Sequence, residues 1–301
     1  MITLQEYLKE KGCEEELARL IHLIADQAGP IRAAFLSNQQ YATSLNVSGE
    51  LQTELDAWSD AHLIKIFSAC GLVSLIASEE QDEVVECEQS PDGYTVVMDP
   101  LDGSSLIAVN LAVGTIVGIY EGGGPVLRKG KEMRAALYLL YGPMTTLTLS
   151  VGSGVAIFAL TEDGRYLLMK DSVRMPEGNL YGSGGERPKW TMKHASFIAE
   201  IEDAGGKCRY SGSFVADFHQ ILKYGGLYAY PGAVGKPEGK LRLLFEAQPI
   251  GFIASQAGGR ISNGQSDILD IIPEKVHQKT PIYVGSRGLI ERLEAMPEQD
   301  S

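Results

Sequence analysis

Two aspartates and a small, hydroxyl-rich run follow one another in the stretch DPLDGSS, which comes directly after the apolar segment VVM. Pro100 restricts the backbone between Asp99 and Asp102, and we expect a turn that points both carboxylates and one backbone carbonyl into a single cavity. Gly103 to Ser105 then offer unhindered backbone N–H groups at a predicted helix start, where an anion is favoured. The stretch therefore predicts a metal site next to a phosphate-binding turn.

Other carboxylates also stand at the ends of apolar runs. They are Glu50, Glu54 and Asp56 in SGELQTELD, Glu79 and Glu80 in ASEEQDE, and Glu246 in KLRLLFEAQP. Carboxylates that share one cleft repel each other unless hard cations such as Mg²⁺ or Mn²⁺ neutralise them. Such cations beside a bound phosphate are what two-metal hydrolysis of a phosphoester requires. The clusters together indicate metal-dependent phosphate chemistry.

Each cluster also has an ordinary structural interpretation. A lone Asp-x-x-Asp is typical of a turn or a helix cap, and two adjacent glutamates are typical of a solvated surface. Glu246 stands four residues after Arg242, so an ion pair on one helical face would also explain it. These interpretations stay open for each cluster taken singly.

Cations and phenols gather in three segments of this acidic chain. Lys240 and Arg242 lie in GKLRLLFE, Arg209 and Tyr210 in KCRYSGSF, and Tyr230 in YGGLYAYPG. Guanidinium groups bind phosphate oxygens in a bidentate manner and phenols add donors, so the set suits a sugar phosphate. Taken singly, each residue is more typical of a surface charge or a core aromatic residue.

Composition and charge limit the class of protein. The 301 residues are 44% hydrophobic and 22% charged, which allows one large core or two moderate ones. No apolar run is long enough for a membrane span, and the charged start MITLQEYLKEKG lacks the apolar region of a signal peptide, so we expect a cytoplasmic protein. The net charge of −13 argues against nucleic acid. The four cysteines form no CxxC pair, and we expect reduced thiols and no zinc site.

Helices and strands alternate around these motifs. Helical patterns occupy 3–12, 14–30, 50–70, 189–204, 243–257 and 288–295, and RYSGSFVADFHQIL opens another helix. Strand-like runs are TVVMD, GTIVGIYEG, AALYLLYG, TTLTLSVG, GVAIFAL, GGLYAYPG and PIYVGS, with a hairpin turn at Asp163-Gly164 and glycine-rich loops at 122–124 and 182–185. We expect an α/β (α+β) chain in two halves, 1–170 and 171–301.

Longer blocks of the chain carry a resemblance. SGELQTELD, DPLDGSS…VGTIVGIY, RYSGSFVADFHQILKYGGLYAYPG, KLRLLFEAQPIGFIASQAGG and IIPEKVHQKTPIYVGS stand in this order between about residues 46 and 286. They resemble class I fructose-1,6-bisphosphatases of the Li⁺-sensitive, Mg²⁺-dependent sugar-phosphatase superfamily. The resemblance implies a layered α-β-α-β-α fold, a homotetramer, and two or more Mg²⁺ or Mn²⁺ ions per site. It implies release of the 1-phosphate of fructose 1,6-bisphosphate in gluconeogenesis, with a metal-binding first half and a substrate-binding second half.

The resemblance also implies roles for single residues. The implied metal ligands are Glu50, Glu79, Asp99, the Leu101 carbonyl, Asp102 and Glu246. Glu80 and Asp56 would orient and deprotonate the attacking water. The implied substrate contacts are Ser104, Ser105 and Arg242 at the 1-phosphate, Tyr210, Tyr230 and Lys240 at the sugar and 6-phosphate, and Arg209 at a neighbouring subunit's site.

The chain departs from the family pattern near the predicted substrate site. Leu106 stands where the family has the asparagine after Gly-Ser-Ser, and Gly184 stands where an asparagine helps to bind the 6-phosphate. We expect Arg187, close to Gly184 in the sequence, to replace the lost contact.

The effector site of the family is also altered. Its N-terminal AMP loop has no match in KGCEEELARL, its Lys-Tyr pair is Gly93-Tyr94 here, and its later arginine is Lys131. We therefore expect AMP to inhibit weakly or not at all.

Three alternatives to a fructose-1,6-bisphosphatase remain. A sedoheptulose-1,7-bisphosphatase, or an enzyme with both activities, would share every metal motif. An inositol monophosphatase fits less well, because KLRLLFE and YGGLYAYPG go beyond the core shared by the superfamily. A non-catalytic sugar-phosphate sensor would not need the full set of carboxylates.

Overall fold

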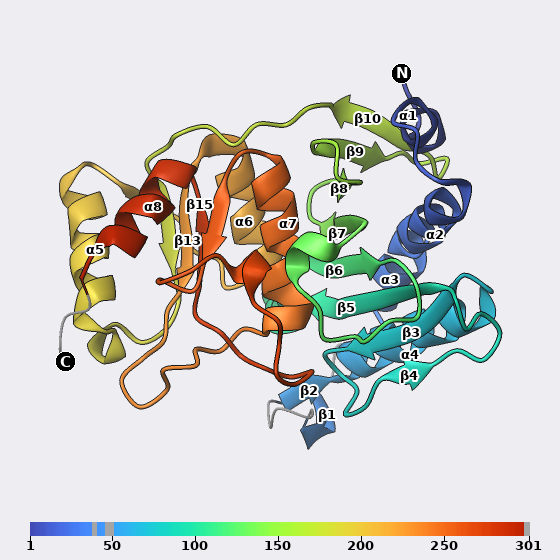
Figure 1. Cartoon of the computed structure of the whole chain (residues 1–301), viewed down its shortest axis with the longest axis horizontal. Helices are drawn as coiled ribbons and strands as arrows, with labels where there is room; N and C mark the ends of the chain where they lie inside the picture. The colour runs from blue at the N-terminus through green and yellow to red at the C-terminus, as the bar shows by residue number, and fades with distance from the viewer. Residues whose placement is uncertain (38–40, 46–50, 298–301) are drawn as a thin grey trace.

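The computed structural model describes residues 1–37, 41–45 and 51–297, with the backbone alone for 41–45 and 51–52. Its elements form five layers, which run from right to left in Figure 1 as helices, a sheet, helices, a second sheet and helices. Apolar cores lie beneath the outer helices on each side and between the two sheets. The predicted layered α-β-α-β-α fold is confirmed.

Four helices form the first layer. They are α1 (Leu4–Glu10), α2 (Glu15–Asp26), α3 (Ala28–Ala34) and α4 (Glu54–Ala69). Thr3 and Glu6 form the capping box that begins α1, as predicted. The prediction that the second helix continues to Gly29-Pro30 was wrong, because the chain bends at Gln27 and Pro30 lies in the first turn of α3, where its missing N–H costs nothing.

Helix α4 begins later than predicted. β1 (Tyr41–Leu45) pairs with β2 (Leu51–Thr53), and Thr53 then caps the helix. Its backbone N–H donates to Asp56 Oδ2 at 2.8 Å, and the Asp56 N–H donates to Thr53 Oγ1 at 3.1 Å. This reciprocal cap sets the helix start at Glu54, four residues after the predicted one.

The first sheet has the order β10-β9-β8-β7-β6-β5-β3-β4 and supplies the predicted run of strands. Its strands are β3 (Val73–Ser78), β4 (Val85–Glu86), β5 (Tyr94–Asp102), β6 (Val113–Tyr120), β7 (Ala135–Tyr141), β8 (Thr145–Ser150), β9 (Ala156–Leu160) and β10 (Tyr166–Lys170). Among the described strands of this sheet, only β3 and β5 are parallel neighbours. The hairpin predicted at Asp163-Gly164 joins β9 to β10.

The second sheet has the order β12-β11-β13-β15-β14. Its strands are β11 (Leu180–Ser183), β12 (Lys207–Cys208), β13 (Gly226–Tyr230), β14 (Arg260–Ser262) and β15 (Ile282–Gly285). α6 (Phe214–Tyr224) and α7 (Gln248–Gln256) lie between the sheets, whereas α5 (Met192–Asp203) and α8 (Arg287–Ala295) cover the outer face (Figure 1). Residues 182–183 were predicted as loop but end strand β11, because that strand pairs with β13.

Short helical turns complete the fold. Four are 3₁₀ helices, η1 (Ser104–Val109), η2 (Gly130–Glu132), η3 (Arg187–Lys189) and η5 (Ile268–Asp270), and η4 (Leu243–Ala247) is a π-helix that leads into α7. The four cysteines are free thiols. Within the described ranges, no helix has both the length and the apolar character needed to cross a bilayer.

Candidate active site

A bulge in β5 positions the two aspartates of DPLDGSS. Asp99 and Asp102 pair with Ile116 and Gly114 of β6, so two residues of β5 oppose a single residue of the neighbouring strand. Pro100 lies in the bulge, where its missing N–H does not interrupt a regular ladder. The predicted turn is therefore a bulged strand, because the pairing with β6 continues on both sides of the proline.

The bulge opens onto a cavity of about 440 Å³. Among the described residues predicted for the site, it is lined by Asp56, Glu79, Glu80, Asp99, Leu101, Asp102, Ser104, Ser105, Tyr210, Tyr230, Lys240, Arg242 and Glu246. It is also lined by Gly103 of the predicted phosphate-binding turn, and by residues that the sequence did not single out for the site: Gly212, Phe214, Tyr228 and Leu241. Arg187 and Arg209 do not line it, and Glu50 lies outside the described residues. Segments from both sheets thus meet at one place.

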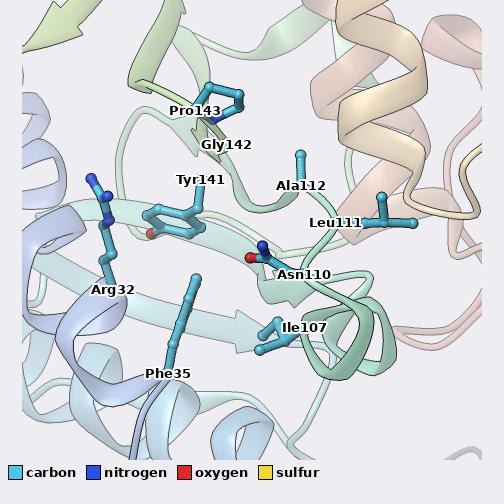
Figure 2. Close-up of a pocket in the computed structure, with 9 residues that line it drawn as sticks. All are labelled: Arg32, Phe35, Ile107, Asn110, Leu111, Ala112, Tyr141, Gly142 and Pro143. Carbon is cyan, nitrogen blue, oxygen red and sulfur yellow. The ribbon is translucent and has the colours of Figure 1, made fainter.

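Another cavity, of about 280 Å³, lies between α3, η1 and the end of β7 (Figure 2). Phe35, Tyr141 and Ile107 face this space, and Arg32 lies at its edge. The described residues that line it include no carboxylate, so they offer no ligand set for a hard cation. The carboxylate-lined cavity is the candidate active site.

Three carboxylates in the larger cavity are arranged to hold a metal ion. Glu79, Asp99 and Glu246 are buried, and one oxygen from each lies within 4.8 Å of the others. Glu79 directly follows β3, and Asp99 lies near the end of its parallel neighbour β5, so both reach the same edge of the sheet. Glu246 enters from η4, in the second half of the chain. Oxygen ligands from three elements suit Mg²⁺ or Mn²⁺.

Burial makes these carboxylates difficult to ionise. The pKa of Asp99 is raised well above its usual value by burial and then by the neighbouring Glu79, Asp102 and Glu246. Burial and the charge of Glu79 also raise the pKa of Glu246, although Arg242 opposes the shift. A divalent cation removes both costs, since it replaces lost hydration and neutralises the negative charges. The donor set therefore fits a bound cation.

Asp102 lies at the N-terminus of α6 as well as in the cavity. Its carboxylate accepts from Ser213 Oγ at 2.7 Å, from the Val215 N–H at 2.9 Å and from the Phe214 N–H at 3.2 Å. Burial raises the pKa of Asp102 to about 6, and these donors oppose the rise. The side chain thus links the bulge of β5 to the first turn of a helix from the other half of the chain.

Asp56 is joined to the predicted phosphate-binding turn. Its Oδ2 accepts from Ser104 Oγ at 2.9 Å and from Thr53 Oγ1 at 2.8 Å. Burial raises the pKa of Asp56, and the hydrogen bonds from Thr53 and Ser104 oppose the rise. Asp56 is therefore a buried carboxylate with a direct link to the hydroxyl of Ser104.

Arg242 lies among the carboxylates. Its Nη1 lies 2.9 Å from Glu79 Oε1, and both side chains are almost fully buried. Its backbone N–H donates to Glu246 Oε2 at 2.6 Å. The sequence left open an Arg242–Glu246 ion pair on one helical face. Arg242 instead precedes η4 in extended conformation and bonds Glu246 through its backbone N–H, and its charge opposes the rise that burial causes in the pKa of Glu246. Arg242 thus presents positive charge to the cavity.

Comparisons with known proteins identify the family. The model described as "Fructose-1-6-bisphosphatase, N-terminal domain" matches residues 6–171, and "Fructose-1-6-bisphosphatase, C-terminal domain" matches residues 175–298. The chain belongs to the fructose-1,6-bisphosphatase family. The resemblance found in the sequence is confirmed, and with it the expectation of a phosphoric monoester hydrolase.

Relatives match this chain over most of their length. The class 1 fructose-1,6-bisphosphatase of Methanocorpusculum labreanum is 60% identical over 296 residues, which cover 98% of this chain and 92% of that one. The enzyme of Methanospirillum hungatei is 57% identical, with 98% and 94% covered. The structure of Leishmania major fructose-1,6-bisphosphatase in holo form matches with a TM-score of 0.92, 30% identity and 98% of each chain covered.

Two of the three arginines predicted to contact substrate, Arg187 and Arg209, do not line the candidate active-site cavity. The Arg187 side chain is 71% exposed, lies 3.6 Å from Glu202 and stacks at 5.6 Å from the Trp190 ring. In this structure η3 directs Arg187 toward Glu202 of α5, and the substrate contact predicted for it stays a prediction. Arg209 is exposed and lies 6.0 Å from the Tyr224 ring.

The sequence analysis missed a residue that supports the carboxylates. Asp60, only 3% exposed, accepts from Ser78 Oγ at 2.5 Å and from Gln81 Nε2. His277 Nε2 contacts the Gln81 carbonyl at 2.8 Å on the other side. The contacts of Asp60 and His277 hold the segment that contains Glu79 and Glu80. The sequence held one signal for Asp60: it stands one helical turn after Asp56, so both carboxylates lie on the same face of α4.

Proposed function

We propose that this protein hydrolyses the 1-phosphate of fructose 1,6-bisphosphate in a Mg²⁺-dependent reaction. The observation that carries the proposal is one cavity that combines three converging carboxylates, a Gly-Ser-Ser turn and cationic and phenolic side chains. Membership of the fructose-1,6-bisphosphatase family supports this substrate.

The residues have separate roles in the proposed reaction. Glu79, Asp99 and Glu246, with Asp102, the Leu101 carbonyl and Glu50, would hold two or more Mg²⁺ or Mn²⁺ ions. When bound, such ions polarise phosphoryl oxygens and lower the pKa of a bound water. Glu80 and Asp56 orient and deprotonate the attacking water, and the hydrogen bond from Ser104 Oγ fixes the position of the Asp56 carboxylate.

Positive and polar groups bind the substrate. The N–H groups of Ser104 and Ser105 and the guanidinium of Arg242 bind the 1-phosphate, where negative charge develops during transfer. Tyr210, Tyr230 and Lys240 bind the sugar and its distal phosphate.

Substitution of two carboxylates tests the assignment. Glu80→Gln removes a group that positions water, and Asp99→Asn removes a metal ligand, so each should lower kcat at least about a hundredfold. The measurement is phosphate release with saturating Mg²⁺, and Glu162→Gln, in the exposed β9–β10 turn, is the matched control. Near-full kcat in either active-site variant would show that the assignment is wrong.

A panel of substrates separates the alternatives. We expect a higher kcat/KM for fructose 1,6-bisphosphate than for inositol 1-phosphate. Hydrolysis of sedoheptulose 1,7-bisphosphate, measured in the same assay, tests whether the protein is a sedoheptulose-1,7-bisphosphatase or has both activities. A sensor without catalysis would bind the sugars but release no phosphate with Mg²⁺.

The assembly and cellular role belong to the same proposal. We propose a cytoplasmic, gluconeogenic homotetramer. Its first half, 1–170, would supply most of the metal ligands, and its second half, 171–301, would supply Glu246 and most of the substrate contacts. Arg209, exposed on the isolated subunit, would complete a neighbour's site. If so, mixing inactive Arg209→Ala subunits with inactive Glu80→Gln subunits restores activity, because some sites then receive both intact groups. Failure to restore it, in a sample shown by light scattering to be a mixed oligomer, contradicts a shared site.

A further inference from the structure

One buried carboxylate in the second half of the chain has no role in the proposed reaction. Asp217 lies in the first turn of α6 and is only 2% exposed. Burial raises the pKa of Asp217, and the backbone N–H groups that it binds oppose the rise. A carboxylate is costly to bury unless hydrogen bonds replace its hydration, so its partners indicate what it does.

Asp217 binds the segment that precedes its own helix, called here the 209–213 loop. The Ser211 N–H donates to both carboxylate oxygens, with N···O distances of 3.0 Å to Oδ1 and 2.9 Å to Oδ2. The Gly212 N–H donates to Oδ2 at 3.3 Å. Hydrogen bonds from backbone N–H groups to an ionised acceptor are among the stronger ones in proteins. One side chain therefore fixes two successive peptide groups of the loop.

The two ends of the 209–213 loop are held by other contacts. At the first end, the Arg209 N–H donates to the Tyr181 carbonyl at 2.7 Å. At the second end, a Cβ on Gly103 would lie 2.8 Å from the Ser213 Cβ, so the phosphate-binding turn packs directly against Ser213. Asp217 thus holds the part of the loop that lies between these two anchors.

Leu106, the departure from the family pattern after Gly-Ser-Ser, lies beside the same loop. A Cβ placed at Gly212 would be 3.7 Å and 3.8 Å from the two methyl carbons of Leu106. These are ordinary packing distances. Because a leucine side chain has no polar atom, it adds no hydrogen bond to the loop. The apolar contact comes from η1, and the polar support comes from Asp217 on α6.

The 209–213 loop carries Tyr210, one of the proposed substrate contacts. The Tyr210 ring lies 6.3 Å from the Tyr228 ring at an angle of 19°, and both residues line the carboxylate-lined cavity. Burial raises the pKa of Tyr210 to about 12, and the charges of Tyr230 and Asp217 add to the rise. The phenol therefore keeps its proton at neutral pH and can donate it to a phosphate or sugar oxygen.

We propose that Asp217 is a positioning residue for the substrate: it holds the 209–213 loop so that the Tyr210 hydroxyl meets the sugar phosphate. Asp217 does not line the cavity, so it acts through Tyr210. A loop that is already fixed loses less conformational freedom when the substrate binds. This inference rests on the proposed function, because Tyr210 contacts substrate only there.

Asp217→Asn tests the proposal. The amide keeps the size of the side chain but replaces one acceptor oxygen by an N–H donor that faces the loop, so the contacts with Ser211 and Gly212 weaken. KM for fructose 1,6-bisphosphate should rise at least about tenfold, and kcat should change less than about threefold. The Mg²⁺ concentration for half-maximal activity should stay within about twofold, because Asp217 bonds to no predicted metal ligand.

A double substitution shows whether Asp217 acts through Tyr210. Tyr210→Ala alone should raise KM at least about tenfold, because the phenol contact is lost. Adding Asp217→Asn to Tyr210→Ala should raise KM less than about threefold further, since the group that Asp217 positions is already absent. A purely structural role for Asp217 would lower the melting temperature and leave KM unchanged.

Controls and direct binding make the result specific. Asp203→Asn, exposed at the end of α5, is the matched control and should change neither KM nor kcat. If Asp217→Asn does not fold, Asp217→Ala takes its place with the same expected result. An unchanged KM in the Asp217 variant, or a further tenfold rise on top of Tyr210→Ala, would overturn the inference.

Binding of fructose 6-phosphate separates this inference from the proposed function. If the wild type releases no phosphate from fructose 1,6-bisphosphate, the proposed function fails. Calorimetry with fructose 6-phosphate on the wild type and Asp217→Asn then still tests the positioning role. Weaker binding to the variant supports it, and equal binding, or no binding to the wild type, overturns it.

Discussion

Burial determines the chemistry of the carboxylates that line the active-site cavity. Asp99 and Glu246 are almost inaccessible to solvent and face Glu79, so each has a raised pKa in the absence of metal. Without a cation, the buried carboxylates lower the stability of the folded chain. With a bound cation, the same carboxylates become favourable, because the cation neutralises their charge. Residues that serve catalysis in this way commonly lower stability.

Replacement of Asp99 should stabilise the metal-free protein. Because the pKa of Asp99 is higher in the folded than in the unfolded protein, its protonated form stabilises the fold. This contribution to the free energy of unfolding is complete below the unfolded pKa of about 3.8. It is lost as the pH rises through the folded pKa. Asp99→Asn has no such loss, so in metal-free buffer its free energy of unfolding should exceed that of the wild type by about 1–2 kcal/mol at alkaline pH and by less near pH 4. Urea unfolding across this range measures the difference.

Mg²⁺ should make the wild type more stable than Asp99→Asn, which reverses the order expected without metal. Mg²⁺ should raise the melting temperature of the wild type and leave that of Asp99→Asn almost unchanged, because the variant lacks a ligand. A variant that is less stable than the wild type in metal-free buffer at every pH would contradict the interpretation of Asp99.

Asp60 acts as a positioning residue for the neighbouring glutamates. In Asp60→Asn, one of the two donors, Ser78 Oγ or Gln81 Nε2, loses its acceptor, and the segment with Glu79 and Glu80 becomes less well held. We expect kcat/KM to fall about tenfold and the Mg²⁺ concentration for half-maximal activity to rise. The matched control is Glu54→Gln, on the exposed first turn of the same helix. An unchanged Mg²⁺ dependence would leave Asp60 with only a structural role.

Two elements meet at Asp102. The bulge of β5 presents the carboxylate, and the first turn of α6 presents the donors that bind it. A regular strand would place neighbouring side chains on opposite faces of the sheet, whereas the bulge changes this alternation. The strand and the helix together therefore define the position of this predicted metal ligand.

Ser213→Ala tests the junction between β5 and α6. The hydroxyl donates to Asp102 and also caps α6 by accepting the Ala216 N–H. We expect the free energy of unfolding to fall by about 1–2 kcal/mol, as for the loss of a buried cap. The pKa of Asp102 should also rise further, because the serine hydroxyl is the largest factor that lowers it. Ser255→Ala, exposed on α7, is the control, and equal stability of the two variants would refute this role.

The complete fold brings the two halves of the chain to one cavity. The first sheet supplies Glu79, Asp99 and Asp102, whereas Glu246 and Arg242 come from the segment before α7. Neither half contains the full set of ligands and phosphate-binding groups. Packing of the two sheets around α6 and α7 is thus a condition for the proposed activity.

The prediction that AMP inhibits weakly or not at all concerns the start of β5. Tyr94, at the position of the family's effector site, donates its hydroxyl to Glu14 at 3.3 Å, and Arg134 lies 3.8 Å from the same carboxylate. A nucleotide phosphate would have to approach that negative charge. Inhibitors coupled to an active site typically act by about 5–150-fold, but we expect millimolar AMP to change kcat/KM by less than about twofold. Strong inhibition in a steady-state assay would contradict this prediction.

Local patterns carried much of the information about this protein. The spacing of DPLDGSS and the carboxylates in SEE and LLFE indicated metal-dependent phosphate chemistry, and apolar periodicity located most helices and strands. Such features depend on residues close together in the chain, which act through backbone preference, capping and hydrophobic pattern. The resemblance then indicated the layered fold and the family.

Contacts between distant segments required the folded chain. The bulge in place of a turn, the Arg242–Glu79 ion pair and the outward position of Arg187 follow from strand pairing and from the packing of the second sheet. Asp60 is a further case, because its partners lie in another element. Local spacing cannot specify these features, since each one depends on which groups are desolvated together when the layers pack.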